Sequence, residues 1–423
     1  MKILHINTYD QGGAAIAAIR LHKALLSQGV DSSILFLEQG KKNIPHSNCY
    51  VDYNKINRKF LCRQFYKLRR IFFPKSEKKY INRVKLLNRI EGFDSFSFNP
   101  CDPDISSQKI CQQANIIHLH WTAGFVDYKI LKKLGKPIVW TLHDMNPFTG
   151  GCHYSNNCNK FKNDCIACPQ LIGTKNINNS YFDQNYKKKC LLSVSPVITS
   201  PSLWLKSCSE QSSVFKEYET IHIPYSLDLS IFKPQNQDFC KKVFDLEDEK
   251  KTILFVSEDI NNIRKGFNLL LEALNKTESK NIQICVIGEN RKSIQNKFNI
   301  VYLGKISDER LISIAYSAAD VLIIPSMEDN LPNVMLESLA CGTPVIAFPV
   351  GGMREVIKTG LNGILSREVN SDSLSIAIKE FIENKYVFNR KIISMAARKA
   401  FSPAQQAKLY ISLYNKILDI NRV

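Results

Sequence analysis

Residues 325–344, PSMEDNLPNVMLESLACGTP, decide the fold class, because they connect a short apolar segment to a helical pattern through a polar loop. Residues 321–324, VLII, precede the loop and predict a buried strand. Pro332 and Asn333 mark the start of the helix, since proline suits a first helical turn. Residues 344–348, PVIAF, predict the next strand. Apolar strands that alternate with helices in this way predict a parallel sheet.

The same alternation continues along the chain on both sides of this segment. Apolar strands are expected at 2–7 and 32–37, with an amphipathic helix over 14–29 between them. Further strands are expected at 115–119, 137–142, 196–200, 252–257, 282–287 and 300–303, and further helices at 266–275, 307–318 and 333–341. Two consecutive doubly wound α/β halves imply a cleft between them.

The length of 423 residues also favours two domains over one. Residues 222–235 contain two prolines and look like the crossing between the halves. We therefore expect a Rossmann-like N-terminal domain at 1–222, a second domain at 223–403 and an amphipathic C-terminal segment at 404–423. The N-terminal domain would carry a basic insertion at 55–90 and a cysteine-rich loop.

Two carboxylates flank the start of the helix that follows strand 321–324. In an open parallel sheet, ligands bind beyond the carboxyl ends of the strands, so the loop after Ile324 is expected to face a ligand. The free amides of a helix N-terminus suit a diphosphate. Asp329 in the loop and Glu337 in the helix could accept hydrogen bonds from sugar and ribose hydroxyls, and such charge-assisted bonds are the stronger kind.

The order of motifs resembles glycosyltransferase family 4, a retaining family with the GT-B fold of two Rossmann-like domains facing a cleft. The resemblance starts from the acidic residue eight positions before Glu337, with seven residues between them, and from the ACGTPVIAF and GGMREVI segments that follow. It extends over nearly the whole chain, through GG at 12–13, IIHLHW, TLHD, HIPYSLDLSIFKP, RKGFNLLLEAL and VIGEN. The resemblance implies a sugar-nucleotide site and an N-terminal domain on the acceptor side, with segment 404–423 crossing back onto it.

The resemblance also implies roles for residues of the second domain. Glu337 would bind the donor ribose and Asp329 the donor sugar, and both acidic positions match the family's spacing. Loop amides at Asn330 and Leu331 would contact sugar or phosphate. Lys265 in RKG would neutralise the departing diphosphate, where negative charge builds up during transfer.

Two residues of the N-terminal domain are implicated in the same way. Gly13 would let the glycine loop approach the diphosphate. His143 in TLHD would face the donor and acceptor sugars, where a neutral imidazole can donate to a hydroxyl. His118 and His120 are nearby in sequence, and for all three a structural role in the core is the alternative.

The chain departs from the family pattern at two positions. Asp329 stands where the family usually has glutamate, which is one methylene longer, so the sugar hydroxyl that it meets is expected to differ. Ser-Glu-Asp follows the strand ending at Ser257, where the family commonly places an arginine. Arg264, beside Lys265, is a candidate for the missing positive charge.

These observations predict a retaining hexosyltransferase that moves a sugar from a UDP- or GDP-sugar to a polysaccharide or a lipid-diphosphate-linked glycan. No metal cofactor is expected for transfer, and Asp102 and Asp104 lie upstream of a strand, unlike a metal-binding DxD motif at a strand end. Alternatives are a GT-B sugar-nucleotide epimerase and a catalytically weak partner in a glycan-assembly complex. A Rossmann dehydrogenase is disfavoured, because no G-x-G-x-x-G follows the first strand.

Four cysteines lie together in the loop 150–170, GCHYSNNCNKFKNDCIACPQ with its preceding glycine. They are Cys152, Cys158, Cys165 and Cys168, and they end in a C-x-x-C pair. Such a set suits a structural zinc ion, since four thiolates leave no open coordination position. Disulfides or redox-labile pairs, and unlinked buried thiols, are the alternatives. The segment resembles a cysteine-rich insertion of some family 4 members.

The net charge of +18 is concentrated in one segment, because 13 Lys and Arg residues and a single acid lie between Lys55 and Arg89. These cations alternate with aromatic and apolar side chains, a pattern typical of segments at anionic membrane surfaces. No accompanying motif favours nucleic acid. With neither a signal peptide nor a long apolar run in evidence, we expect a cytoplasmic protein bound peripherally to the inner membrane face.

Overall fold

A computed structural model gives the fold of the chain and describes residues 1–41, 43–52, 94–99, 101, 103–172, 178–277, 281–289 and 298–420. The basic segment 55–90 and Asp102 therefore lie outside the described residues. The chain divides into two compact units. The first comprises 1–200, 206–222 and 409–423, and the second comprises 201–205 and 223–408.

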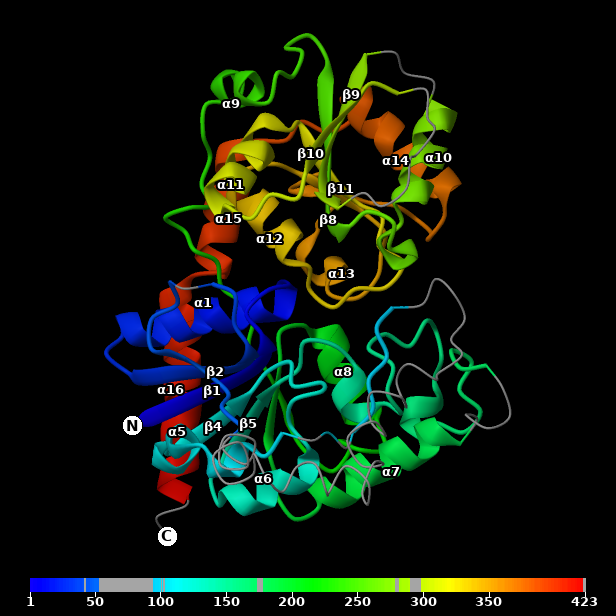
Figure 1. Cartoon of the computed structure of the whole chain (residues 1–423). Coiled ribbons are helices and arrows are strands. Elements are labelled where there is room, and N and C mark those ends of the chain that lie inside the picture. The colour runs from blue at the N-terminus through cyan, green and yellow to red at the C-terminus, as the bar shows by residue number, and fades with distance from the viewer. Residues whose placement is uncertain are drawn as a thin grey trace, which may run out of the picture. The chain divides into compact units, whose positions relative to one another are not determined.

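The first unit is built on a seven-stranded sheet in the order β3-β2-β1-β4-β5-β6-β7, in which every neighbouring pair is parallel (Figure 1). The strands are β1 Lys2–Tyr9, β2 Asp31–Glu38, β3 Ser47–Cys49, β4 Ile116–Leu119, β5 Ile138–Thr141, β6 Val197–Ser200 and β7 Thr220–His222. The central strands β1, β4 and β5 are almost wholly buried, as near-continuous apolar runs in a parallel sheet must be.

Helices connect these strands. They are α1 Gly13–Ser27, α5 Lys109–Gln113, α6 Tyr128–Leu134, α7 Asn179–Leu191 and α8 Leu203–Gln211, with single 3₁₀ turns η1 Ile105–Ser107, η2 Asn146–Phe148 and η3 Lys160–Lys162. A long helix, α16 Pro403–Ile420, begins in the second unit and continues into the first. Its Tyr410 and Tyr414 are buried there, where Tyr410 hydrogen-bonds with Thr141 of β5 at 2.8 Å.

The second unit has a six-stranded sheet in the order β10-β9-β8-β11-β12-β13, again parallel at every pairing. Its strands are β8 Lys251–Asp259, β9 Ile282–Glu289, β10 Ile300–Gly304, β11 Val321–Ile324, β12 Val345–Ala347 and β13 Gly363–Leu365. Its helices are α9 Gln237–Val243, α10 Phe267–Thr277, α11 Glu309–Ala318, α12 Asn333–Ala340, α13 Met353–Val356, α14 Ser371–Ile382 and α15 Arg390–Ala400, with a 3₁₀ turn η4 Ile263–Lys265.

The core of the second unit lies between its sheet and the helices α10 and α14, which pack against each other (Figure 1). Leu270 and Leu274 of α10 belong to the same buried core as the strand residues Ile253 and Phe255. The apolar face of α10 repeats at helical spacing, which is the pattern that predicted this helix.

The structure confirms the predicted α/β class and the alternation of strands and helices. Strand 321–324 and the start of the helix at Asn333 are placed as predicted. The short edge strands β3, β7 and β13 were not predicted, because three residues are too few to show a period. Within the described ranges, no helix combines the length and the apolar character needed to cross a membrane.

Candidate active site

The topology of the second unit brings two loops together at one edge of the sheet. The strand order reverses between β8 and β11, which are neighbours although α10, β9, β10 and α11 separate them in sequence. Ligands bind at such a switch point in open α/β sheets, beyond the carboxyl ends of the strands. The loop after β8 carries Arg264 and Lys265 in η4, and the loop after β11 carries Asp329. Backbone hydrogen bonding joins the loops, since Met327 N donates to Arg264 O at 2.9 Å.

Lys265 and Arg264 both contact the carboxylate of Asp329. Lys265 Nζ lies 2.6 Å from Asp329 Oδ2, and Arg264 Nη1 lies 3.4 Å from the same oxygen. Arg264 Nη1 also donates to the carbonyl of Glu328 at 2.7 Å. This group therefore has two cations and one carboxylate, and it carries an excess of positive charge.

Burial and the two cations act on Asp329 in opposite directions. The side chain is only 5% exposed, and its burial alone would raise the pKa. The charges of Lys265 and Arg264 outweigh that penalty, so the pKa of Asp329 falls to about 2. Asp329 is consequently ionised at any physiological pH.

Two glycines allow the backbone to pack tightly around this carboxylate. Gly266 has a φ of 72°, and a Cβ built on it would lie 1.9 Å from the carbonyl oxygen of Pro325. Gly351 has a φ of 51°, and its Cβ would lie 1.7 Å from the carbonyl oxygen of Asp329. Any side chain at either position would collide with backbone that cannot rotate away. The glycines in RKG and in GGMREVI therefore build the site, a role that the sequence pattern alone did not assign.

Asn330 and Leu331 follow Asp329 and are fixed by contacts within the second unit. Asn330 O accepts from Gly352 N at 2.7 Å, and Asn330 Oδ1 accepts from Ser202 Oγ at 2.6 Å. Leu331 is buried, with an exposed fraction of 5%. Ser202 was missed at the sequence level, because its segment belongs by contacts to the second unit although it precedes β7 in the chain.

Glu337 lies one turn inside α12 and is held by a buried tyrosine. The OH group of Tyr316, on α11, donates to Glu337 Oε2 at 2.9 Å. Glu337 is 5% exposed, and Tyr316 is fully buried. No side chain caps the N-terminus of α12, where Pro332 occupies the capping position. The backbone amides of the first turn therefore have no side-chain acceptor from the capping residue.

In the first unit, histidines from neighbouring strands form a hydrogen-bonded series. His5 of β1 pairs in register with His118 of β4, His120 follows β4, and His143 follows β5. His5 Nδ1 lies 2.9 Å from His120 Nε2, and His120 Nδ1 lies 3.1 Å from His143 Nε2. We call His5, His120 and His143 the histidine chain.

Burial keeps these imidazoles neutral. It lowers the pKa of His5, His118 and His120 well below the usual value of 6.5, with neighbouring histidines adding to the effect. Burial also lowers the pKa of His143 to about 4, although Asp144 acts in the opposite direction. Neutral imidazoles can each donate one hydrogen bond and accept one, as a hydrogen-bonded series requires.

The same histidines include a possible metal-binding group. Among the described residues, three or more ligand side chains with atoms within 4.8 Å of one another occur only at His5, His118 and His120. Both nitrogens of His118 are hydrogen-bonded, to Tyr414 OH at 2.6 Å and to Thr141 Oγ1 at 2.7 Å. A metal ion would have to break these bonds, so the arrangement suits a hydrogen-bonded core better than a metal centre.

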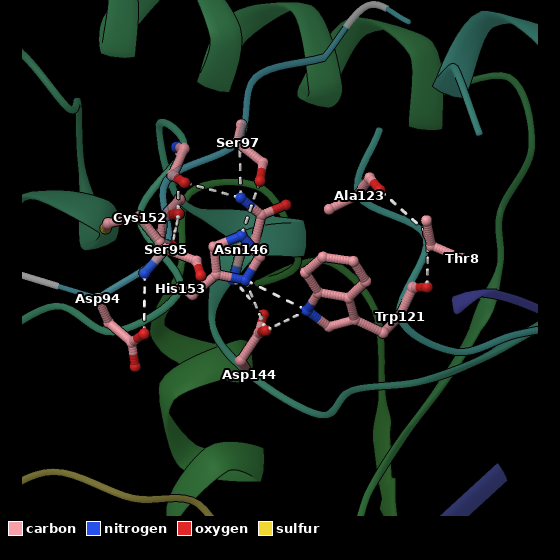
Figure 2. Close-up of polar contacts among 12 residues, drawn as sticks. Thr8, Asp94, Ser95, Ser97, Trp121, Ala123, Asp144, Asn146, Cys152 and His153 are labelled. Carbon is pink, nitrogen blue, oxygen red and sulfur yellow. Dashed lines mark hydrogen bonds and ion pairs between the residues drawn. The ribbon is translucent and has the colours of Figure 1, made fainter. Parts of the chain in front are cut away.

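Asp144, next to His143, is the centre of a second polar network (Figure 2). Its Oδ2 lies 2.6 Å from His153 Nδ1 and accepts from Trp121 Nε1 at 2.7 Å. Its Oδ1 accepts from Asn146 N at 2.9 Å. Burial alone would raise the pKa of Asp144, but His153 and these donors outweigh burial and lower it. His143 and Asp144 also line a cavity, together with His120, Trp121 and Asn99.

Gly13 is the first residue of α1, directly after Gly12 at the helix cap. Gly12 has a φ of 86°, which favours glycine, and no side chain caps the helix. The glycine pair therefore turns the chain from β1 into α1 at the carboxyl end of β1. This is the first unit's own switch point, between β1 and β4.

The four cysteines of the loop 150–170 line one cavity in the first unit. Cys152 and Cys165 are buried, and Cys158 and Cys168 are partly buried. All cysteines in the described residues have free thiols. No three of the four sulfur atoms lie within 4.8 Å of one another, since the described residues meet that criterion only at the histidines named above.

The predicted site residues thus fall into groups. Arg264, Lys265 and Asp329 contact each other, and Asn330, Leu331 and Glu337 belong to the same unit. Gly13 and His143 belong to the first unit, as do the four cysteines. The three-dimensional structure adds further residues to these groups, which are Tyr316, Ser202, Gly266, Gly351 and the partners of His143.

Comparisons with known proteins identify relatives of the chain. Residues 236–400 match the family model described as "Glycosyl transferases group 1". A putative colanic acid biosynthesis glycosyl transferase, WcaC of Escherichia coli, is 23% identical over 99% of this chain and 100% of its own length. An uncharacterized glycosyltransferase of Methanocaldococcus jannaschii is 25% identical over 68% of this chain and 70% of its own.

Solved structures share the fold over nearly the whole chain. HepE of Anabaena, solved in complex with UDP, has a TM-score of 0.64 at 15% identity and covers 98% of this chain and 100% of its own. Sucrose-phosphate synthase of Thermosynechococcus elongatus has a TM-score of 0.62 at 16% identity, covering 99% and 100%. At these identities the likeness shows the fold. The chain therefore has the GT-B fold, and the match of residues 236–400 to the group 1 model indicates that it is a glycosyltransferase.

Proposed function

We propose that this chain transfers a sugar, with retention of anomeric configuration, from a nucleotide-diphosphate donor to a polysaccharide or lipid-linked glycan. The observation that carries the proposal is the group formed by Lys265, Arg264 and Asp329 at the carboxyl ends of β8 and β11. An excess of positive charge at a sheet switch point suits a diphosphate, whose negative charge grows as it departs.

The donor would be held by residues of the second unit. Glu337, oriented by Tyr316, would accept hydrogen bonds from the ribose, and Asp329 would accept them from the sugar. Backbone amides of Asn330 and Leu331, and those at the start of α12, would contact phosphate or sugar. The Anabaena relative in fold was solved with UDP and with UDP-glucose, which supports a nucleotide-sugar donor of this class.

The first unit would supply Gly13 and His143. A neutral His143 could donate to a sugar hydroxyl or accept from it, because its low pKa keeps it uncharged. Retention would proceed with the leaving phosphate accepting the proton of the incoming hydroxyl on the same face. The protein would contribute positioning and electrostatic stabilisation, with no divalent ion required.

The acceptor class rests on two observations. The relative of matching length is named for colanic acid biosynthesis, which favours an envelope polysaccharide. The basic aromatic segment 55–90 would bind an anionic membrane surface on the cytoplasmic side, where lipid-linked glycans are presented. Replacing Arg63, Lys67, Arg69 and Arg70 by glutamine should abolish co-sedimentation with anionic vesicles, and unchanged co-sedimentation would contradict this part of the proposal.

Donor screening tests the central proposal. UDP and GDP, and then their sugars, should be compared by thermal shift, and the best donor should then be assayed for hydrolysis and for transfer. We expect stabilisation by one nucleoside diphosphate, and a product whose anomeric proton coupling matches that of the donor. Stabilisation by none of them would contradict the proposal, and a free epimer formed without acceptor would indicate an epimerase.

A further inference from the structure

The loop that follows His143 and Asp144 encloses a cavity that the proposed sugar transfer does not use. Its lining includes Cys152, Cys158, Cys165 and Cys168, together with Phe161 and Gln170. Four thiols around one cavity form an unusual concentration of soft ligands, and the described residues show no disulfide among them.

Tight backbone packing fixes Cys165 at this cavity. A Cβ on Gly150 would lie 2.7 Å from the Cβ of Cys165 and 2.4 Å from Ser180 O, so only glycine allows the two sides of the loop to approach this closely. Gly150 N donates to Cys165 Sγ at 3.2 Å. This hydrogen bond fixes the sulfur atom of Cys165 at the cavity.

The C-x-x-C turn is also fixed. Ala167, between Cys165 and Cys168, has a φ of 50°, a left-handed conformation that is strained for a residue other than glycine. Lys160 Nζ donates to the carbonyls of Ile166 and Ala167 at 2.9 and 2.7 Å and so stabilises this turn. The surrounding loop therefore maintains a strained turn that places two cysteines at the same cavity.

We propose that these four cysteines bind one structural zinc ion. Four sulfur ligands suit zinc and leave no position for water, so the ion would stabilise the loop and take no part in chemistry. Binding would release one proton from each thiol to solvent as its Zn–S bond forms. Tetrahedral zinc places sulfur atoms about 3.8 Å apart. No three of these sulfur atoms lie within 4.8 Å of one another among the described residues, so binding would draw the four cysteines closer together.

The loop braces the segment that contains His143. His153, adjacent to Cys152, bonds Asp144 through its ring and accepts from Met145 N through its carbonyl at 3.0 Å (Figure 2). Asn146 Nδ2 donates to Gly151 O at 2.8 Å. An ion that fixes Cys152 would also fix its neighbours Gly151 and His153, and through their hydrogen bonds the segment that follows His143. The zinc proposal itself is independent of the sugar-transfer proposal.

Metal analysis of the purified full chain tests this proposal. Protein prepared under reducing conditions without chelator should contain about one zinc per chain. A mercurial reagent should release that zinc, as detected with a colorimetric zinc indicator. The variants Cys158→Ser and Cys168→Ser should lose it, and they alter partly buried residues so that folding is retained. Cys49→Ser, at an exposed thiol, is the matched control and should keep the metal.

Further outcomes would overturn the proposal. One is the absence of zinc both in the purified chain and after zinc is added to the reduced protein. Another is a mass lower by about two hydrogens per cysteine pair with no metal, which would show disulfides in its place. Chelation should also lower the thermal midpoint of the wild type and leave that of Cys168→Ser unchanged. Equal shifts in both proteins would contradict a zinc ion at this site.

Discussion

The two units use opposite electrostatics at equivalent places in their sheets. Each places its candidate site residues where the strand order reverses, between β8 and β11 in the second unit and at β1, β4 and β5 in the first. The second unit gathers ionised groups there, with Lys265 and Arg264 on Asp329. The first gathers buried histidines that are kept neutral. The same architecture therefore carries a charged group in one unit and a neutral hydrogen-bonded group in the other.

The difference agrees with our proposal that the second unit binds a diphosphate and that His143 meets sugar hydroxyls. A diphosphate is recognised by fixed positive charge, and Asp329 holds the partly buried cations Lys265 and Arg264 in place. Sugar hydroxyls need donors and acceptors without net charge. Substitutions that remove one charge or one imidazole at a time test this contrast.

Removing the principal cation should have the largest effect. Lys265→Ala should lower kcat/KM by about 100- to 1,000-fold, because a charge that stabilises the departing diphosphate is lost. Steady-state kinetics with the identified donor would measure it. Lys276→Ala removes a more exposed cation of the same unit, one that pairs with Asp372, and should leave kcat/KM within about twofold. Similar losses in both variants would indicate a general effect of charge.

Removing the charge of the helix carboxylate should have a smaller effect. Glu337→Gln keeps the shape and an acceptor for Tyr316, but loses the charge-assisted bonds to the ribose, so the donor KM should rise about tenfold. Tyr316→Phe should raise it less, because the carboxylate remains. Glu272→Gln, on the exposed face of α10, is the control. An unchanged donor KM in Glu337→Gln would remove Glu337 from the donor site.

Breaking the histidine chain should affect turnover more than donor binding. His120→Gln cannot replace both ring nitrogens, so His143 loses the partner 3.1 Å away that selects its tautomer. We expect kcat to fall about tenfold with little change in donor KM. Nitrogen NMR of His143 should show a changed tautomer, a signature that loss of stability alone would not produce. His46→Gln, at an exposed histidine, should leave both measurements unchanged.

Acid should destabilise the two units unequally. The folded pKa of His118 is below its unfolded value near 6.5, so the unfolded chain binds more protons and stability is lost as pH falls below about 6.5. Asp329 instead remains ionised down to about pH 2, so its ion pairs persist. Urea titrations at pH 7.5 and 5.5 should show that His118→Gln removes about 1 kcal/mol of the acid-induced loss. A wild-type stability that does not change between these pH values would contradict this.

Much of the fold was predictable, because buried parallel strands are short apolar runs and the helices between them are amphipathic. The identity of Asp329 and Glu337 as site candidates followed from their spacing around a helix start. The contact of Asp329 with Lys265 did not, because it depends on β8 and β11 being neighbours in a sheet, which no local pattern records. Likewise, the histidine chain requires the order β1, β4, β5.

The glycines that pack against the candidate site were the hardest residues to predict from the sequence. In the sequence, Gly351 is one of two consecutive glycines before a helix, and the pattern allows a simple turn. Only the structure shows that the carbonyl of Asp329 occupies the place where a side chain on Gly351 would lie. Tyr316 was similarly hidden, since a tyrosine on the apolar face of α11 looks like an ordinary core residue until its hydroxyl is found 2.9 Å from Glu337.

The two tyrosines of α16 have a consequence for the time course of folding. Tyr410 and Tyr414 complete the hydrogen bonds of Thr141 and His118, yet residues 223–408 must be synthesised between β7 and these tyrosines. At about 5–20 residues per second, that interval lasts about 10–40 s. During translation, the first unit therefore lacks the hydrogen bonds of these tyrosines until α16 has been synthesised. The second unit can fold before then. The first unit thus completes its folding after the second.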